Sequence, residues 1–469
     1  MSKNSNSSFS SDDEYYGYNG EEFRNEILKN NYCLIEKIGY GSFSSVWLAY
    51  SYCNNNYYAI KIQNNEDYED GISELHFLKK IKKLKNDNFI KLIDSFEISK
   101  KDGKKKRKHV CMVLPLMAGS IYSILRKGKY KDGVDEIFIK KFLNCLLSTI
   151  SDLHNKLQIC HVDLKPENIL IDGISIKVKE MIEEYNTFNI NMVVNEKIPK
   201  PETMNSNQKK KYKKQRNNCI KETHKTILSE MISLYDDESA SEISSSIESD
   251  ISYNTDSDSQ LEYNNIVENI NYINSSESEP LSNLYDLSES DEDTIIDDVI
   301  DDEIINKCQL VLTDFGSSFK IDELEDDELQ TRYYRAPEVI LGMKYNEKID
   351  IWSIGCILYE LYTGKILFDP EKDKKYTRDF NHLFMIEQYL GHFPKKMIAS
   401  SPKKTTFYNK KFCLKCDIPI KKQEFEIDNP YILDMIQKCL VIDPKDRPSI
   451  NELVEGFNKT SNSQINSHF

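Results

Sequence analysis

The stretch HVDLKPEN, residues 161–168, decides how the rest of the chain is interpreted. It holds a carboxylate at Asp163, a cation at Lys165 and an amide at Asn168. A carboxylate that accepts the proton of a hydroxyl, followed by an amide that can ligate a divalent metal, is an arrangement used for phosphoryl transfer. The pattern that serves this chemistry is H-R-D-L-x-x-x-N, and here its Arg is replaced by Val162. The question is whether Val162 removes the activity or changes its control.

Further motifs stand in the order that phosphoryl transfer requires. The glycine-rich stretch GYGSFSSV, residues 39–46, can close its backbone over phosphates because glycine has no side chain, although Ser44 replaces a third glycine. YAIK ends at Lys61 and precedes a helix with Glu74, which matches a phosphate-binding lysine and the carboxylate that orients it. LTDFG supplies Asp314 as a magnesium ligand. Each residue alone reads equally well as a turn or cap, but their joint order favours a catalytic set.

Two folded regions differ in their patterns. Residues 31–117 show alternating apolar runs separated by Gly and Asn clusters, which predict a small sheet of hairpins, with one helix expected over residues 68–84. The basic run KKDGKKKRK, residues 100–108, predicts a charged hairpin tip, with contact to RNA or to an acidic partner as the alternative. From Gly119 onward the pattern is mainly helical. We therefore expect an α+β fold with a small antiparallel sheet and a larger helical part.

Residues 180–306 interrupt the helical part. They begin with a basic cluster, QKKKYKKQR, and then contain no Lys or Arg from Ser229 through Asn306. Such a segment repels itself and buries little apolar area, so we expect a largely disordered, acidic, low-complexity insert. It is either a solvated segment or a tether with acidic phosphorylation sites and a nuclear import signal.

Composition excludes several classes of protein. The chain has 469 residues with a net charge of −15, which argues against direct nucleic-acid binding. No apolar stretch is long enough for a membrane span, and the polar N-terminus has no signal core. The 11 Cys indicate reduced thiols and a cytoplasmic or nuclear location, undecided between the two. Cys413 and Cys416 form a CxxC without further zinc ligands nearby, so ordinary packing is favoured.

Outside the insert, residues 32–456 resemble a eukaryotic protein kinase domain. TRYYRAPEVILG (331–342) and DIWSIGCILYEL (350–361) are similar to the branch that contains cyclin-dependent, mitogen-activated, SR-protein and LAMMER kinases. The glycine loop with Ser44 and Trp47 resembles SR-protein kinases, which are also split by a long spacer, and HLFMIEQYLGHFPKKMI (382–398) resembles LAMMER kinases. The choice between these two subfamilies stays open.

The resemblance implies a two-lobed fold and a division of the chain. We expect a disordered tail over residues 1–30, an N-lobe over 31–117, a C-lobe over 118–179 and 307–458 that is split by the insert 180–306, and a C-terminal tail over 459–469. The resemblance also makes Asp350 a structural anchor under the catalytic loop and pairs Arg447 with Glu338.

The resemblance further implies ATP and Mg²⁺ as cofactors and assigns the site residues. Catalytic roles fall to Asp163 as proton acceptor and to Lys165, Lys61, Glu74 and Thr331, while Asn168 and Asp314 bind metal. Lys165 and Thr331 match serine/threonine rather than tyrosine kinases. The nucleotide is expected to contact Gly39, Tyr40, Gly41, Ser42, Phe43, Ser44, Val46, Ala59, Lys61, Leu114, Met117 and Leu170. Pro115 at the hinge is unusual because it lacks a backbone N–H.

The same resemblance indicates what Val162 means for the control of the activity. In many kinases the Arg at this position grips a phosphate on the activation loop, but SR-protein and LAMMER kinases carry a small residue there and are active. Residues 319–330 offer no hydroxyl for a regulating phosphate. The acidic run 322–328 either pairs with Arg332 or Arg335 or is a solvated surface.

These observations predict a monomeric Ser/Thr kinase that acts on proteins, with Arg/Ser-rich substrates favoured by the resemblance and with no need for activation-loop phosphorylation. Proline-directed and LAMMER-type preferences stay open. The alternative is a pseudokinase or scaffold that presents the insert to partners, for which Val162 and Ser44 are the only support.

Overall fold

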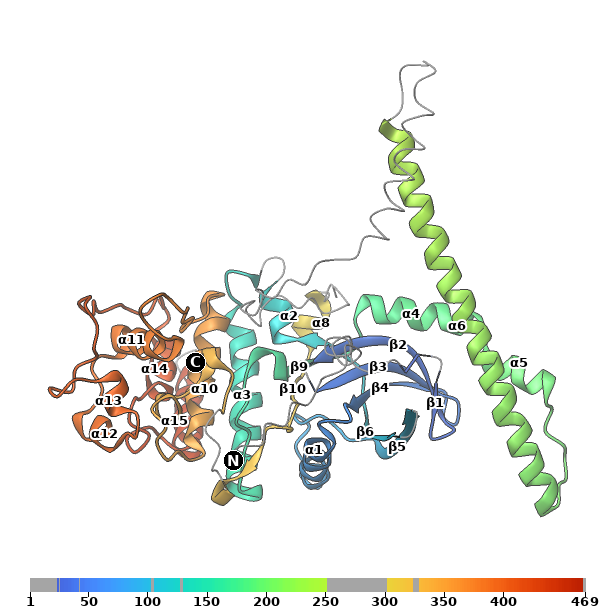
Figure 1. Cartoon of the computed structure of the whole chain (residues 1–469), viewed down its shortest axis with the longest axis horizontal. Helices are drawn as coiled ribbons and strands as arrows, with labels where there is room; N and C mark the ends of the chain where they lie inside the picture. The colour runs from blue at the N-terminus through green and yellow to red at the C-terminus, as the bar shows by residue number, and fades with distance from the viewer. Residues whose placement is uncertain are drawn as a thin grey trace, which may run out of the picture. The chain divides into compact units, whose positions relative to one another are not determined.

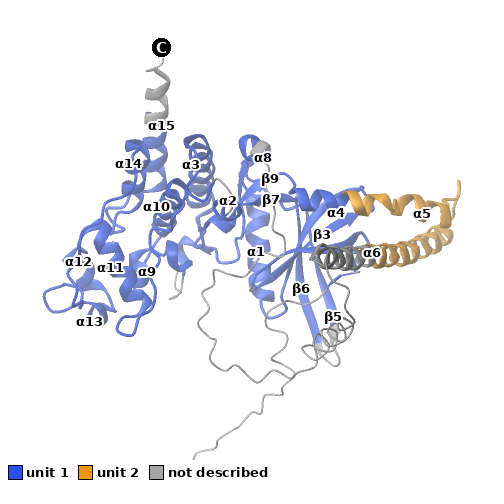
Figure 2. Ribbon diagram, turned by 90° about the horizontal axis from the view of Figure 1, so that it is seen from above, with its two compact units in different colours: residues 1–182, 298–469 blue, residues 183–297 orange. Residues whose placement is uncertain are grey.

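The computed structural model describes residues 23–24, 26–41, 43–102, 105–126, 130–250, 302–323 and 329–466. Several of our expectations concern residues outside these ranges: most of the N-terminal tail, Ser42, the tip of the basic hairpin, much of the acidic insert, part of the acidic run in the activation segment, and the end of the C-terminal tail. The chain divides into two compact units, residues 1–182 with 298–469, and residues 183–297 (Figure 2).

The first unit begins with an antiparallel sheet. Its strands, in spatial order, are β1 (Ile27–Leu28), β2 (Tyr32–Gly41), β3 (Ser44–Ser51), β4 (Asn56–Gln63), β6 (Lys105–Leu114) and β5 (Asp94–Asp102). The expected hairpin between the last two strands is present, and its strands pair as far as Asp102 and Lys105. Alternate residues of each strand point to opposite faces, so the sheet needs a cover on both sides.

Helix α1 (Tyr68–Ile81) covers one face of this sheet. It buries Leu75, Phe77 and Leu78 in the main core, together with Glu74. On the other face Trp47 is fully buried, and the ring of Phe23 packs edge-on against it at 6.4 Å between centroids. The sheet is therefore held rigidly on both sides, which fixes the strands that lead into the glycine-rich loop.

Helices dominate the rest of the first unit (Figure 1). The central helix α10 (Lys348–Thr363) buries Trp352 and nearly all of its other side chains. A helix that is buried on all sides in this way lies in the core of its unit. The other helices are α2 (Ile121–Leu125), α3 (Glu136–Ser151) with its continuation η2 (Asp152–Leu157), α8 (Asp302–Lys307), α9 (Pro337–Ile340), α11 (Arg378–Leu390), α12 (Lys395–Ser400), α13 (Lys404–Phe407), α14 (Pro430–Cys439) and α15 (Ile450–Asn466).

Short strands and turns connect the sheet to these helices. β9 (Ile169–Asp172) pairs with both β7 (Met117–Ser120) and β10 (Leu310–Leu312), while β8 (Ile159–Cys160) pairs with β11 (Phe319–Lys320). Single turns lie at η3 (Pro166–Asn168), η4 (Ile321–Glu323) and η5 (Arg332–Tyr334). The loops that leave β8 and β10 carry HVDLKPEN and LTDFG, so these pairings bring the two motifs together.

The second unit contains α5 (Ile190–Lys197) and α6 (Ser206–Asp250), and α4 (Ile176–Thr187) leads into it. Ile190, Val194, Ile220 and Ile227 are buried, and Tyr185 hydrogen-bonds His224 Nδ1 at 2.9 Å. This regular structure differs from the disorder that we expected from residue 180 onward. The high charge of the insert led us to overlook a short seam of apolar side chains. This seam is enough to hold α5 and α6 together.

The α+β architecture, with a small antiparallel sheet followed by a larger helical part that an insert splits, is confirmed by these elements. None of the helices in the described residues is both long enough and apolar enough to cross a membrane.

Candidate active site

The two loops that carry the predicted metal ligands are hydrogen-bonded to each other. The backbone N–H of Thr313 donates to the carbonyl oxygen of Asn168 at 3.0 Å, and His161 Nε2 lies 3.0 Å from the carbonyl oxygen of Thr313. Because a carbonyl only accepts, His161 carries its proton on Nε2 in this contact. These bonds place Asn168 beside Asp314, although the two are far apart in the sequence.

Lys61 is held between two carboxylates. Its Nζ lies 2.9 Å from Oε1 and Oε2 of Glu74 and 2.9 Å from Oδ1 of Asp314. Burial alone would lower the pKa of Lys61, but the charges of Glu74 and Asp314 outweigh burial and raise it. The charge of Lys61 in turn lowers the pKa of Asp314. A fixed cation and a fixed anion thus stand together where strand β4 and the loop after β10 meet.

A second cluster surrounds Asp163. Lys165 Nζ lies 3.0 Å from Asp163 Oδ2, and the hydroxyl of Thr331 donates to Asp163 Oδ1 at 2.7 Å. The side-chain amide of Asn168 donates to the carbonyl oxygen of Asp163 at 2.8 Å. The Asp163 carboxylate is therefore oriented from several sides, and it is a hydrogen-bond acceptor with a cation beside it.

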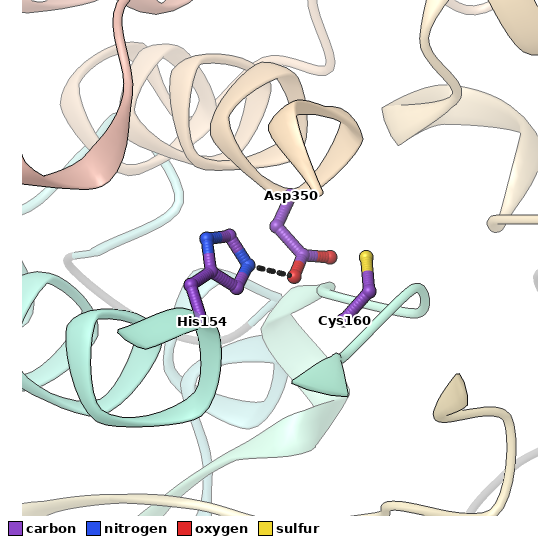
Figure 3. A group of neighbouring side chains, drawn as sticks. All are labelled: His154, Cys160 and Asp350. Carbon is purple, nitrogen blue, oxygen red and sulfur yellow. Dashed lines mark hydrogen bonds and ion pairs between the residues drawn. The ribbon is translucent and has the colours of Figure 1, made fainter. Parts of the chain in front are cut away.

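Asp350 supports this loop from below. It is fully buried and accepts the backbone N–H groups of His161 at 2.9 Å and Val162 at 2.8 Å, as well as His154 Nε2 at 2.8 Å (Figure 3). Burial would raise the pKa of Asp350, but the hydrogen bond from His154 and the other contacts lower it. The anchor role that the resemblance implied for Asp350 is confirmed by these contacts.

Cys160 completes a group of three potential metal ligands with His154 and Asp350, all buried and all with donor atoms within 4.8 Å of one another (Figure 3). Zinc takes four ligands in structural sites, and both oxygens of Asp350 already accept hydrogen bonds. We therefore assign this group a structural role. In the part of the chain that the structure describes, Cys413 and Cys416 belong to no such group.

The expected nucleotide-binding residues lie on neighbouring strands. Gly39 pairs with Val46 across β2 and β3, Val46 pairs with Lys61, and Ala59 pairs with Leu114. A Cβ atom added to Gly41 would meet nothing within 4 Å, so the fold itself does not require glycine there and the space over the loop is open. Of the other described members, Tyr40 lies in β2, Phe43 in the turn before β3, Ser44 at the start of β3, Met117 in β7 and Leu170 in β9.

The activation segment is fixed by a residue that the sequence analysis did not single out. Gln330 is buried, with φ of 68°, and its side-chain nitrogen donates to Ser353 Oγ at 2.9 Å and to the Ile349 carbonyl at 3.1 Å. Its side-chain oxygen accepts the N–H of Ala336 at 2.9 Å. No motif marks Gln330, and only its position directly before Thr331 could have drawn attention to it.

Both arginines of this segment have partners outside the acidic run. Arg332 pairs with Asp379 of α11 at 2.6 Å, and Arg335 donates to the Gln330 carbonyl at 2.9 Å. Residues 324–328 of the acidic run lie outside the described residues, so the proposed pairing with these arginines stays a prediction. Arg447 forms a bidentate ion pair with Glu338 at 2.7 and 2.9 Å, which confirms that predicted pair.

The chain is similar in sequence to a known protein family and to several known proteins. A family model described as the protein kinase domain matches residues 32–181 and 302–456. Serine/threonine-protein kinase L205 of Acanthamoeba polyphaga mimivirus is 32% identical over 439 residues, covering 85% of this chain and 80% of that protein. Serine/threonine-protein kinase SRPK of Physarum polycephalum is 28% identical (83% and 74% covered), and protein kinase dsk1 of Schizosaccharomyces pombe is 27% identical (93% and 82% covered).

Proposed function

This chain belongs to the protein kinase family and is a serine/threonine protein kinase similar to SR-protein kinases, and we propose that it transfers phosphate from ATP to Arg/Ser-rich proteins with the aid of Mg²⁺. We further propose that it does so without phosphorylation of its activation segment. The observation that carries the proposal is the convergence of Lys61, Glu74 and Asp314 beside the cluster around Asp163.

Lys61 is the residue that would hold the phosphates, and Glu74 orients it, since both oxygens of Glu74 contact its Nζ. Asp314 and Asn168 would hold Mg²⁺, which prefers oxygen ligands of this kind and would neutralise charge on the phosphates. The side chain of Asp314 is 41% exposed, so its carboxylate remains accessible to an ion. The open space over Gly41 fits a phosphate group that approaches the backbone.

Asp163 is the proposed proton acceptor for the substrate hydroxyl. Its carboxylate is positioned by Thr331 and Lys165. Lys165, which lies 3.0 Å from Asp163, would also stabilise the negative charge that develops on the transferred group. Thr331 makes both a side-chain and a backbone contact to Asp163, so it couples the acceptor to the activation segment.

Independence from activation-segment phosphorylation is supported by Gln330 and Val162. Gln330 ties the segment to α10 and to Ala336 with neutral hydrogen bonds, which need no phosphate. Val162 is 1% exposed and belongs to the hydrophobic core, so it offers no charge to a phosphorylated residue. The charged contact that phosphorylation completes in many kinases therefore has no counterpart at this position.

The Arg/Ser-rich substrate class is supported by the names of relatives, among them SRSF protein kinase 3 of Mus musculus at 23% identity. An acidic surface also suits such substrates. A cavity of about 820 Å³ lies between the start of α3, the end of α10 and the segment before α14. Its carboxylates come from Asp132, Asp135, Glu136, Glu426 and Asp428. Negative potential of this kind attracts cationic peptides.

The test is phosphate transfer from labelled ATP and Mg²⁺ to three peptides: an Arg/Ser repeat, a proline-directed peptide and an acidic peptide. The enzyme is used directly after treatment with a phosphatase, and Asp163→Ala is the control. We expect transfer to the Arg/Ser repeat, loss of transfer in Asp163→Ala, and no lag phase. A preference for the proline-directed peptide would overturn the substrate class, and activity that appears only after autophosphorylation would overturn the proposal on regulation.

A further inference from the structure

The insert contains a basic region within an acidic chain. Between residues 196 and 225 there are ten Lys or Arg and three Glu. This region covers the end of α5 and the first half of α6, which belong to the second unit. The net charge of −15 reflects the whole chain and hides this local excess of positive charge. Binding to a charged partner depends on this local distribution of charge, and therefore on the face of the helix on which these side chains lie.

Four lysines form a stripe along α6: Lys210, Lys214, Lys221 and Lys225. At 100° per residue their side chains lie within about 60° of one another, and at 1.5 Å per residue the stripe is about 22 Å long. All four are exposed. Among the side chains that the structure describes, none of these lysines has a carboxylate within ion-pair distance. Among the described side chains, the stripe is therefore a row of positive charge without ion-pair partners.

The hairpin of α5 and α6 keeps this stripe in a fixed orientation within the unit. Ile220, Thr223 and Ile227 are buried, and at 100° per residue they lie about 110° or more from the centre of the stripe. Arg216 donates to Asn195 of α5 at 2.8 Å, and His224 bonds Tyr185. The apolar side of α6 is thus occupied by its own unit, and the lysines are left on a solvated side.

The polar and charged side chains on and around the stripe argue against several classes of binding partner. A helix that lies on a membrane needs apolar side chains beside its cations, and the exposed positions of residues 206–230 are all polar. A protein interface needs an apolar or aromatic centre, which is missing for the same reason. Interfaces with nucleic acids are instead polar and strongly positive. A row of lysines without exposed aromatic rings also lacks the stacking platform that single strands require.

We propose that this stripe binds the phosphate backbone of double-stranded DNA without sequence specificity. An α-helix with its side chains is about 10–12 Å wide and fits the major groove of B-DNA, whereas the major groove of duplex RNA is narrow and deep. Lysines contact phosphates as point charges and read no bases. This inference does not rest on the proposed phosphate transfer, and it runs against our expectation from net charge, which argues against direct nucleic-acid binding.

The test is fluorescence anisotropy with the full chain and a labelled DNA duplex of about 20 base pairs, which exceeds the length of the stripe. The measurement starts at low salt because the acidic part of the same chain competes with DNA. The key variant is Lys210→Gln, Lys214→Gln, Lys221→Gln and Lys225→Gln combined, since glutamine keeps helix propensity and removes charge. A matched control replaces Lys410, Lys411, Lys421 and Lys422 by Gln, which changes the net charge equally.

We expect the stripe variant to bind DNA at least about tenfold more weakly and to lower the slope of log K against log salt by about three to four. The matched control and a variant with four arginines in the stripe should bind like the wild type, and phosphate transfer to peptides should be unchanged in all of them. Absence of DNA binding by the wild type, equal weakening in the matched control, or equal or tighter binding of an RNA duplex of the same sequence would each overturn the proposal.

Discussion

The backbone N–H of Val162 donates to Asp350 Oδ1 at 2.8 Å, which holds Val162 with φ of 75° directly before Asp163. A β-branched residue with positive φ is strained, at a cost of about 1–3 kcal/mol. The strain is tolerated because Asp350 also binds the N–H of His161, so a buried carboxylate on α10 sets the path of the loop. The geometry of the loop therefore depends on Asp350 rather than on the side chain at position 162.

We expect Val162→Ala to keep phosphate transfer within about threefold of the wild type. The loss of two buried methyl groups costs about 2 kcal/mol, and relief of β-branching offsets part of this cost. Steady-state kinetics measure the rate of phosphate transfer, and urea unfolding measures the change in the free energy of unfolding. Asp350→Ala is the comparison, and it should lower transfer far more because it leaves two buried N–H groups without an acceptor. If Val162→Ala were as inactive as Asp163→Ala, Val162 would itself be essential and the pseudokinase alternative would regain support.

Removal of either charge at the phosphate site should abolish most of the activity. We expect Lys61→Met and Asp314→Asn to reduce kcat/KM by at least about 100-fold, because each removes a charge that stabilises the transferred group or its metal. Lys438→Met is the matched control, since Lys438 pairs with Asp434 on the exposed surface of α14. Transfer rates with the preferred peptide, measured over a range of Mg²⁺ concentrations, provide the readout. Near-normal rates in either site variant would reject the site assignment.

Gln330 offers a test of how the activation segment is held. We expect Gln330→Ala to destabilise the chain by about 1–3 kcal/mol, since buried groups at Ser353, Ile349 and Ala336 lose their partner. Gln330→Gly removes the same amide but relieves the positive φ of 68°, so it should be more stable than the alanine variant by up to about 1 kcal/mol. Both substitutions should increase the rate at which a protease cleaves the activation segment. Equal stability of the two variants would show that φ carries no strain here.

The order of motifs was enough to predict the fold and which residues converge. Lys61, Glu74 and Asp314 lie far apart in the sequence, yet each sits in a short pattern with a fixed place in phosphoryl transfer, and the structure brings them within hydrogen-bond distance. Alternating apolar runs likewise indicated the small sheet, because a strand with one buried face has period two. These features are local or belong to a known template, so they can be read along the chain.

The features that we did not predict from the sequence depend on contacts between elements that are distant along the chain. Gln330 acts through Ser353, which is on another element, and no local pattern announces such a pair. For Arg332 the sequence offered only the acidic run of its own segment as one of two alternatives, and no local pattern indicated its partner Asp379 on α11. In the insert, charge dominated our interpretation, while the seam around Ile220 and Val194 depends on a few residues. Tertiary partners of polar side chains are the part that periodicity and motif order do not contain.

Glu360 gives a prediction for pH dependence. It is buried on α10 and accepts a hydrogen bond from the hydroxyl of Tyr334 at 2.7 Å. Burial raises the pKa of Glu360 from 4.5 to about 7, although the Tyr334 hydroxyl opposes this shift. The folded state therefore keeps a proton between these two pH values that the unfolded state has lost. The stabilisation is fully present below pH 4.5 and is lost as the pH rises through 7, which amounts to about 3 kcal/mol in total.

We expect Glu360→Gln to remove this dependence, because glutamine keeps an acceptor for Tyr334 and does not titrate. Urea unfolding at pH 5 and pH 8 should show that the variant gains about 2.5 kcal/mol relative to the wild type between the two conditions. Tyr334→Phe is the second variant. It removes the hydrogen bond that lowers the pKa of Glu360, so the loss of stability should shift to a higher pH. Parallel pH profiles for the wild type and Glu360→Gln would mean that Glu360 is ionised in the folded chain and that its burial is compensated by other charges.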